Sequence, residues 1–442
     1  MSLSSSAQTS ARFGPIALAP GVTVHHTLCY LWAAFVSIGI FTYITTLQPY
    51  VLRVNLGIAP GDTGKVGGSL QFWQEILALL VIGLVGAWSD RVGRRLVYIV
   101  GFMVAALAYA AYPFANDYNQ LLIYRLVFAL GVATLGGMLA TVLADYPQER
   151  DRGKLAGLAF FLNASGALIF FTLLNRLPSF FASRGLDELW AGRASYLFAA
   201  GVCVLSALIM FGLKPGRPAE VKPKVALLEQ ARSSVTAARQ PRIALAYAAS
   251  FAARADLVIV ALFLAQWMQN VAQMDGMTAA EAAKKLSLPF AAVQIAATFW
   301  APFFGWLSDQ LNRVTLLIIA IVISIAGYGW VGITADPLQA AAVPALIVLG
   351  IGQASGILGT QVLIGQEAPG AIRGAVIGMV GFCGAVGILA ISKLGGFAFD
   401  HWTPGAPFLI MALANAALLI FAVYVRARSP GPMAAELRAA KL

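Results

Sequence analysis

Four ionisable side chains stand inside long apolar stretches of this sequence: Glu75, Arg125, Arg254 and Asp256. Placing a charge in such surroundings costs about 2.5 kcal/mol or more, so each of them is a candidate functional residue. A carboxyl group in an apolar environment keeps its proton more readily than in water. An arginine there stays charged and can bind an anion through its planar guanidinium. These residue types predict a site that carries protons and binds an anion.

The composition shows what surrounds these charges. Hydrophobic residues make up 60% of the 442 and charged residues 11%, whereas about 25% of a typical soluble domain is charged. The sequence therefore predicts an integral membrane protein. Its net charge of +11 comes from Lys and Arg between apolar runs, which is typical of loop charge rather than of a nucleic-acid groove. We expect the lipid bilayer, and no nucleic acid, as a partner.

The apolar runs are long enough to cross a membrane as helices, which takes about 20 residues each. Turn-forming or charged stretches such as "GIAPGD" and "DHWTPG" separate them. We predict twelve membrane helices, at 27–52, 64–88, 96–115, 119–145, 154–177, 194–213, 243–269, 286–308, 314–335, 338–365, 371–397 and 406–426.

Orientation follows from the Lys and Arg residues in the loops, which favour the cytoplasmic side. With a cytoplasmic amino terminus, about 20 of them lie in inner loops and tails and about 8 lie outside. Residues 1–24 contain no apolar core typical of a cleaved signal peptide. We expect a multi-pass plasma-membrane protein, or an inner-membrane protein in a bacterium, with both termini cytoplasmic.

The stretch 214–242 is basic, flanked by prolines and follows the sixth predicted helix. It divides the chain into an N-terminal six-helix bundle at 27–213 and a C-terminal one at 243–426, with cytoplasmic tails at 1–26 and 427–442. The linker is either fully solvated or carries a short amphipathic helix on anionic lipid.

A cluster of charged residues, "GAWSDRVGRR" at 86–95, lies at the end of the second predicted helix. The stretch "GWLSDQLNR" at 305–313 resembles it. A shift of 219 residues lays Gly86 on Gly305 and Asp90 on Asp309. A shift of 221 lays Arg152-Gly153 on Arg373-Gly374. The sequence therefore predicts that the chain contains two parallel six-helix repeats. This architecture is found in carriers that bind substrate between their two halves.

The loop residues have physical roles that suit this position. We expect Gly86 to allow close approach of a neighbouring helix and Gly93 to allow a sharp turn. Asp90 can accept hydrogen bonds. We expect Arg91, Arg94 and Arg95 to pair with carboxylates such as Asp145 and Glu149 when the inner faces of the two halves meet. In the second copy, Asp309 and Arg313 hold the matching positions.

This loop resembles the G-x-x-x-D-R-x-G-R-R motif of the major facilitator superfamily, in its usual place between the second and third membrane helices. The resemblance covers essentially the whole chain. It implies an all-α fold of twelve helices in two pseudo-symmetric bundles, monomeric function without a cofactor, and a role for the loop as a latch that stabilises the outward-open state. Arg125 resembles the fourth-helix arginine implicated in proton transfer in related transporters, although Ala129 replaces a usual glycine. A purely structural Arg125, bonded to backbone carbonyls, is the alternative.

We identify the candidate substrate-binding and proton-carrying residues by their distance from the membrane surface along each helix. Glu75 lies roughly 22 Å from the inner loop, and its repeat counterpart is Gln294. Glu75 either carries a proton or binds substrate, or it is neutralised by a fixed partner. The fifth helix adds a polar Asn163.

Arg254 and Asp256 lie about 18 and 21 Å beyond Arg242 along the seventh helix. Residues two apart point in different directions, so we expect different partners for them. Arg254 is the candidate anion-binding group. Asp256 is either a second proton carrier or the fixed counter-ion of a cation such as Lys393.

The absence of metal-site and nucleophile patterns from the sequence also limits the functions that we expect. Cysteines and histidines are scattered, with no spacing typical of a metal site or of a nucleophile with its base, so neither a metal nor an enzyme is expected. We predict a proton-coupled transporter that works by alternating access and symports a small anionic metabolite. The alternative is a proton-driven exporter of drugs or amphiphilic compounds, but the fifth helix, "GLAFFLNASGALIFF", lacks the Gly-Pro motif common in such antiporters.

Overall fold

The computed structural model describes residues 11–216 and 227–432. Within them, twelve helical spans are long and apolar enough to cross a membrane, which confirms the predicted all-α fold. The helices that form them are α1 Val24–Val54, α2 Thr63–Val92, α3 Arg94–Ala111, α4 Tyr118–Asp145, α5 Arg152–Leu173, α7 Glu188–Ile209, α9 Pro241–Val258 with α10 Ala265–Met274, α11 Ala279–Gln310, α12 Arg313–Gly332, α13 Val343–Glu367, α14 Arg373–His401 and α15 Ala406–Arg428. Each contains the core of one predicted segment. We call the helix ends predicted to face the cytoplasm the inner ends, and the opposite ends the outer ends.

The seventh span is not one regular helix. A π-helical segment, Ile259–Leu264, joins α9 to α10. Such segments are rare and are frequent at functional sites. The irregular turn lies five residues beyond Arg254 along the chain, on the outer side of it.

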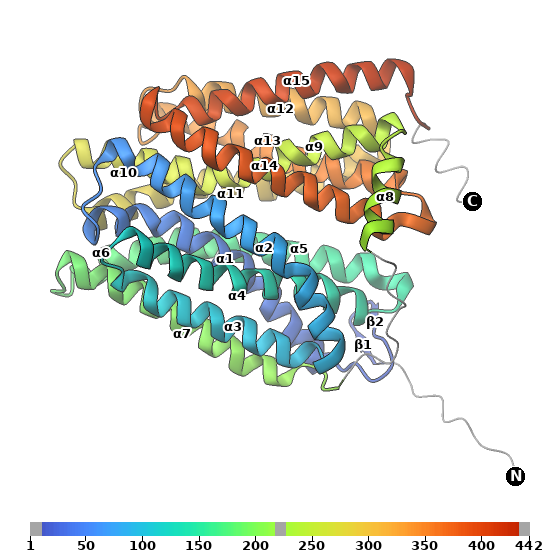
Figure 1. The fold of residues 1–442 in the computed structure, drawn as a ribbon, viewed down its shortest axis with the longest axis horizontal. Coiled ribbons are helices and arrows are strands. Elements are labelled where there is room, and N and C mark those ends of the chain that lie inside the picture. Colours follow the sequence, from blue (N-terminus) through green and yellow to red (C-terminus); the bar gives the residue numbers. More distant parts are fainter. Residues whose placement is uncertain (1–10, 217–226, 433–442) are drawn as a thin grey trace, which may run out of the picture. The chain divides into compact units, whose positions relative to one another are not determined.

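The described residues form two compact units. The first contains 11–44, 77–170 and 193–216, and the second contains 45–76, 171–192 and 227–432. The second unit thus groups the outer parts of α1, α2 and α7 with all of α9 to α15 (Figure 1). The two six-helix halves stay a prediction from the repeat.

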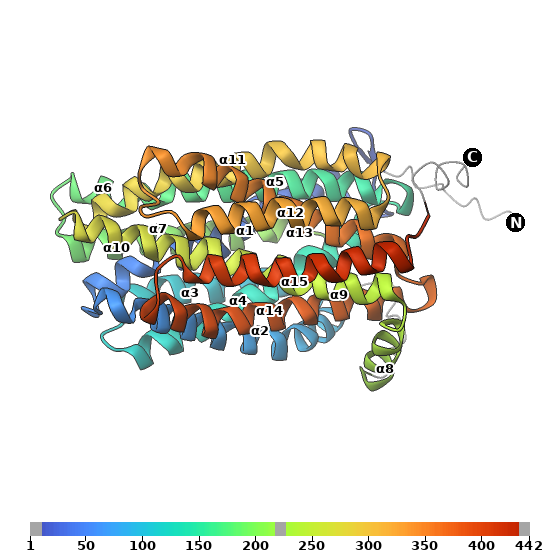
Figure 2. The same cartoon turned by 90° about the horizontal axis from the view of Figure 1, so that it is seen from above.

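Helices within the second unit pack through small residues. The helices α9, α13 and α14 run side by side (Figure 1), and α12 lies along α13 and α15 (Figure 2). A Cβ atom on Gly350 of α13 would lie 2.2 Å from the Val293 carbonyl oxygen of α11. Close approach of this kind is how membrane helices gain packing contacts.

The internal repeat is visible in the packing of each unit. In the first unit, a Cβ atom on Gly131 would lie 3.0 Å from the Ala105 backbone nitrogen. In the second unit, a Cβ atom on Gly352 would lie 2.8 Å from the Ser324 Cα atom. Gly352 is the repeat counterpart of Gly131, and Ser324 that of Ala105, so both units use the same helix crossing.

The N-terminal segment is more ordered than a plain tail. Strands β1 (Arg12–Phe13) and β2 (Ile16–Ala17) form a small hairpin. The Ala17 amide donates to the Asp151 carboxylate at 2.9 Å, and the Ala19 amide donates to the Tyr146 carbonyl at 2.8 Å. This hairpin therefore docks on the turn between α4 and α5, a contact that the description of 1–26 as a cytoplasmic tail did not include.

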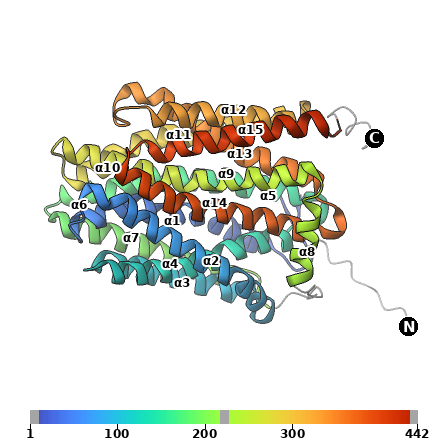
Figure 3. The same ribbon diagram turned by 45° about the horizontal axis from the view of Figure 1, so that its top comes forward.

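The linker carries the short helix that was one of its two predicted forms. Helix α8 spans Leu227–Ala237 and lies across the inner ends of α9 and α14 (Figure 3). The Tyr247 hydroxyl of α9 donates to the Ser234 carbonyl of α8 at 3.1 Å. Residues 217–226 of the linker lie outside the described part. A second short helix, α6 (Leu177–Ala182), follows α5.

The fold predicts that Gly166 of α5 is needed for packing in the first unit. A Cβ atom there would lie 1.7 Å from the Phe35 carbonyl oxygen of α1, whereas Gly157 of the same helix has no atom within 4 Å. Gly166→Ala should destabilise the protein by about 1–3 kcal/mol because α1 and α5 must separate. Thermal unfolding in detergent measures this. Gly157→Ala is the matched control and should unfold at the original temperature or slightly above it; equal melting temperatures for the two variants would refute the packing role.

Candidate functional site

The charged loop between α2 and α3 is a turn of a single residue. Helix α2 continues to Val92 and α3 begins at Arg94. Gly93 between them has a φ of +97°, a conformation that costs little only for glycine. The predicted sharp turn at Gly93 is therefore present.

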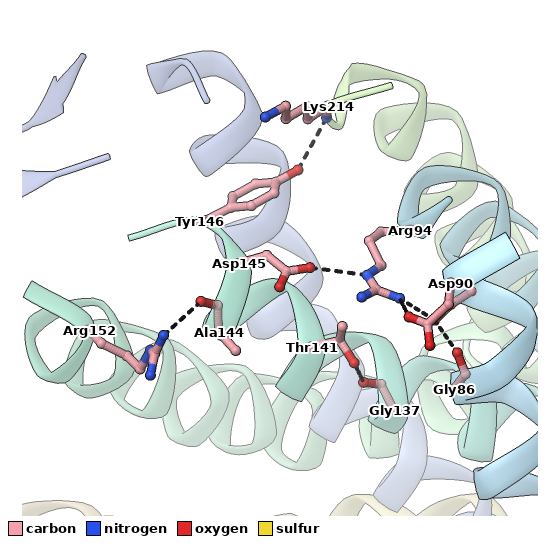
Figure 4. Close-up of polar contacts among 11 residues, drawn as sticks. Gly86, Asp90, Arg94, Gly137, Thr141, Ala144, Asp145, Tyr146, Arg152 and Lys214 are labelled. Carbon is pink, nitrogen blue, oxygen red and sulfur yellow. Dashed lines mark hydrogen bonds and ion pairs between the residues drawn. The ribbon is translucent and has the colours of Figure 1, made fainter. Parts of the chain in front are cut away.

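Arg94 is the centre of the polar contacts at this turn (Figure 4). Its guanidinium forms ion pairs with Asp90 at 2.7 Å and with Asp145 of α4 at 3.1 Å. It also donates to the Ser89 hydroxyl. The predicted pairing of Arg94 with Asp145 is confirmed. All of these residues belong to the first unit, so the pair does not need the two halves to meet, as we had expected.

The other loop residues do not follow the expectation. Arg95 lies over the Phe211 ring, 5.4 Å from its centroid, and Arg91 is exposed. Glu149 pairs instead with Arg152 at 2.7 Å. A Cβ atom on Gly86 would have no described atom within 4 Å, so the expected close helix approach at Gly86 is wrong.

The second copy of the loop repeats these bonds in the second unit. Asp309 and Arg313 form a looser pair at 3.8 Å, with the same four-residue spacing as Asp90 and Arg94. The Ser89 hydroxyl donates to the Gly86 carbonyl at 2.8 Å, and its counterpart Ser308 donates to Gly305 at 2.7 Å.

A further matched pair of bonds follows α4 and α13. Arg152 donates to the Ala144 carbonyl at 3.2 Å (Figure 4), and Arg373 donates to the Gly365 carbonyl at 3.1 Å. These four residues are related by the shift of 221. The internal repeat found in the sequence is therefore also a repeat of hydrogen bonds.

Glu75 and Arg254 are brought close together in the second unit. The Arg254 charge acts electrostatically on Glu75 of α2, while neither side chain forms an ion pair within 4.0 Å in the described part of the chain. Glu75 is partly buried and Arg254 is exposed. An exposed guanidinium thus acts electrostatically on a partly buried carboxyl group of another helix.

A glycine makes room for the Arg254 side chain. A Cβ atom on Gly384 of α14 would lie 2.1 Å from Arg254 Cδ and 3.0 Å from the Ser250 hydroxyl. Ser250 itself donates to the Val380 carbonyl of α14 at 2.7 Å. Arg254 therefore crosses α14 over Gly384, a positioning role that the sequence did not reveal.

Asp256 faces away from Arg254 and toward α12 and α13. It is only 1% exposed and lies beside the Tyr328 hydroxyl. Gln353 donates to its backbone carbonyl at 3.3 Å. Lys393 does not neutralise it: the Lys393 ammonium donates to the Ser69 hydroxyl of α2 at 3.2 Å and lies 4.9 Å from the Phe72 ring centroid. The suggested Asp256–Lys393 pair is therefore not formed.

Arg125 is enclosed in the first unit. It is fully buried, bonds to the Tyr112 hydroxyl and lies 5.7 Å from the Phe128 ring centroid. Tyr109 and Tyr196 are also close enough to interact with it. The Tyr112 hydroxyl is thus one partner of Arg125, and the choice between a proton-transfer role and a structural role stays a prediction.

The two predicted polar residues on α5 and α11 are partly buried. The Oδ1 atom of Asn163 has no hydrogen-bond partner among the described residues. The Gln294 side chain is half-buried, and its backbone carbonyl accepts from Thr298 at 2.7 Å. They belong to different units, so each stays a separate candidate.

Sequence reasoning missed a group of buried amides near the outer ends of α1, α2 and α10. A Cβ atom on Gly67 would lie 2.9 Å from Gln266 Oε1 and 3.0 Å from Gln48 Nε2. Gln266 is fully buried, and neither its Nε2 nor its Oε1 atom has a hydrogen-bond partner within the described ranges. The polar residues in "LQPY", "QFWQE" and "AQWMQN" were the available signal.

A cavity of the second unit lies elsewhere, at the linker helix. This open cavity at α8 has a volume of about 540 Å³ and is lined by Glu229, Arg232 and Gln240 among others; no predicted substrate residue lines it. Among the described residues, no three His, Cys, Asp or Glu side chains come together as a metal site would require.

The contacts of Arg94 predict its contribution to stability. Arg94→Ala leaves Asp90 and Asp145 facing each other without their shared cation, so it should lower the free energy of unfolding by about 1–3 kcal/mol. Arg91→Ala is the matched control because Arg91 is exposed on the same turn. Thermal unfolding in detergent distinguishes them. Equal shifts for the two variants would mean that the cluster has no net stabilising effect.

Comparison with known proteins agrees with this architecture. The chain is 26% identical to the magnetosome protein MamH of Paramagnetospirillum magneticum, over 90% of this chain and 91% of the relative. The nucleoside transporter NupG superposes with a TM-score of 0.69 and 15% identity, covering 90% of this chain and 98% of that structure. A D-xylose–proton symporter superposes with a TM-score of 0.70 and 17% identity, covering 90% and 96%.

The family assignment follows from a match along the whole chain. The family model described as "Major Facilitator Superfamily" matches residues 30–283 and 249–441. Both copies of the charged turn lie inside these matches. The chain belongs to the major facilitator superfamily and is a membrane transporter rather than an enzyme.

Proposed function

We propose that this transporter symports a small anionic metabolite with protons by alternating access, using Arg254 to bind the anion and Glu75 to carry the proton. What supports this is that the Arg254 charge acts on the Glu75 carboxyl group within the same unit, without an ion pair within 4.0 Å in the described part of the chain. A guanidinium that is not locked in an ion pair can exchange its partner for a substrate carboxylate or phosphate.

Charge balance explains why the two bindings would be coupled. In the empty site the Arg254 charge is balanced by ionised Glu75. When an anion binds Arg254, the carboxylate loses its counter-ion, and protonation of Glu75 restores neutrality. A site with only the anion or only the proton carries a net charge, which is costly in a low-dielectric environment. Only the empty and the doubly loaded sites are neutral, so only these should cross between the two orientations.

The other intramembrane charges have weaker support as coupling groups. The Asp256 carboxyl group lies beside the neutral Tyr328, and it forms no ion pair within 4.0 Å in the described part of the chain, so no anion-binding cation is paired with it. Arg125 is enclosed by tyrosines, which suits structural support of its bundle. Asn163 and Gln294 are proposed as polar contacts for the substrate. The D-xylose–proton symporter is an example of this fold that couples transport to protons.

The membrane that holds the protein is also part of the proposal. We propose the plasma membrane, with both termini cytoplasmic, because Lys and Arg are concentrated in the loops on that side. The name of the relative MamH, a magnetosome protein, makes the magnetosome membrane the second candidate. Fractionation of the native host separates the two.

The symport mechanism predicts different effects for the two residues. In proteoliposomes with a pH dye inside, pools of organic anions added outside should drive proton movement in the wild type. Glu75→Gln, which mimics the protonated state, should abolish proton movement but keep anion exchange. Arg254→Ala should reduce both by about tenfold or more, because a charge-assisted contact is lost.

Matched controls lie in the exposed part of the linker. Glu229→Gln and Arg239→Ala remove the same charges at exposed positions and should leave both readings unchanged. If no anion moves protons, but amphiphilic cations do and only Glu75 matters, the exporter function replaces the symporter and Arg254 becomes a structural residue.

The position of Gly384 gives a second test. Gly384→Ala should displace the Arg254 side chain and raise the anion concentration for half-maximal transport by about tenfold, with the protein still folded. Gly381→Ala is the control on the same helix, because a Cβ atom there meets nothing within 4 Å. Unchanged anion affinity in Gly384→Ala would show that Arg254 does not bind the anion in the position described.

A further inference from the structure

The outer end of α2 is bonded to a carboxylate from α14. Asp400 accepts the Gly64 amide at 2.8 Å and the Lys65 amide at 2.6 Å. Both amides belong to the first turn of α2, where backbone N–H groups lack partners within the helix and the helix dipole favours a negative charge. Asp400 thus satisfies the start of a helix more than 300 residues away in the chain.

The outer end of α11 is bonded in the same way. The Glu188 carboxylate, at the start of α7, accepts the Ala279 amide in the first turn of α11 at 2.5 Å. The Tyr50 hydroxyl of α1 donates to the Glu188 backbone carbonyl and holds this residue in place. All of these groups lie in the second unit.

The two contacts involve helices that the internal repeat relates, but their carboxylates are not repeat counterparts, since residue 188 shifted by 219 is 407. Helices α2 and α11 are repeat counterparts, since the shift of 219 relates their inner ends. The N-terminal half supplies the α2 end and Glu188, and the C-terminal half supplies the α11 end and Asp400. Each half therefore contributes one helix end and one carboxylate.

The helices around these contacts approach closely but through polar and small groups. A Cβ atom on Gly68 of α2 would lie 2.0 Å from the Ser392 carbonyl oxygen of α14. Arg53 donates to the Met277 carbonyl at 3.2 Å, and Arg176 donates to the Ser287 hydroxyl at 3.1 Å. The contacts between the outer helix ends therefore include several hydrogen bonds that water could replace.

The buried Gln266 shows that the close packing of the outer helix ends leaves some polar groups without hydrogen bonds. Its amide atoms have no partner in the described part of the chain, and an unsatisfied buried polar group is destabilising. Separation of the outer ends would hydrate such amides. That gain offsets part of the loss of the carboxylate contacts, so closed and open forms can be close in free energy.

We propose that Asp400 and Glu188 are two clasps that hold the outer ends of the halves together, and that both release when the outer side opens. The inference rests on the alternating access of the proposed function, but not on proton coupling or on the substrate. Each clasp is a carboxylate bonded to a helix amino end, and the loss of one shifts the population toward the open form without dissolving either helix.

A buried reporter tests the clasps. Gln266→Cys is placed in a background with the native Cys29, Cys203 and Cys383 replaced, and intact cells are treated with a maleimide that does not cross the membrane. Asp400→Ala and Glu188→Ala should each raise the labelling rate about fivefold, and the double variant should raise it further. Asp400→Asn keeps an acceptor oxygen without the charge and should lie between.

The control for these variants is another outer carboxylate. Asp117 caps its own helix, α4, by accepting the Gln120 amide at 2.9 Å, so Asp117→Ala removes a cap without releasing a clasp. Labelling that rises equally in Asp117→Ala, or that stays unchanged in both clasp variants, would overturn the proposal.

A second measurement does not depend on the reporter at Gln266. Cysteines at Ser69 and Lys393, whose side chains are 3.2 Å apart, should form a cross-link in the parent and lose about fivefold of it when either clasp is removed. An undiminished cross-link overturns the proposal. Both assays are made without substrate, so their outcome does not depend on whether transport is coupled to protons. If transport proves to be proton-coupled but the labelling is unchanged, the clasp proposal is rejected and the proposed function stands.

Discussion

The cost of an unbalanced charge in a low-dielectric environment governs how this protein is built. Most Lys and Arg residues lie in loops, in the tails or near the ends of the helices. Arg125 is bonded to a tyrosine hydroxyl, and Lys393 contacts a serine and an aromatic ring. Arg254 differs because its carboxyl neighbour, Glu75, forms no close ion pair with it among the described residues. A charge that is balanced but not locked suits a transported ion and a coupled proton.

The same local solutions occur twice in the chain. The bond from Ser89 to Gly86 recurs from Ser308 to Gly305, and the bond from Arg152 to Ala144 recurs from Arg373 to Gly365. The copies are not equal, since Asp90 and Arg94 are closer than Asp309 and Arg313, and Arg94 alone also reaches a carboxylate on another helix. Repetition therefore preserves the backbone geometry of the turn, while its ion pairs differ between the two copies.

Hydrogen bonding at the outer amino ends of helices is the second recurring feature. Backbone N–H groups in the first turn need acceptors, and three outer helix ends obtain them differently. Asp117 serves its own helix, whereas Asp400 and Glu188 serve helices distant in the chain. Local caps stabilise single helices. Caps from distant residues make the stability of a helix end depend on how the helices are assembled, which links helix capping to conformational change.

The sequence by itself determined the twelve spans, the repeat and the pairing of a loop arginine with Asp145, because hydropathy, fixed spacing and opposite charge on adjoining turns are local signals. Which of the three loop arginines pairs with Asp145 was decided by the tertiary structure. Only the tertiary structure decided that Lys393 meets Ser69 rather than Asp256, that Arg254 crosses Gly384, and that Asp400 caps α2. The two-residue strands at Arg12 and Ile16 were missed because they are too short for a periodic pattern. These features depend on helix rotation and on contacts hundreds of residues apart, which hydropathy and spacing do not specify.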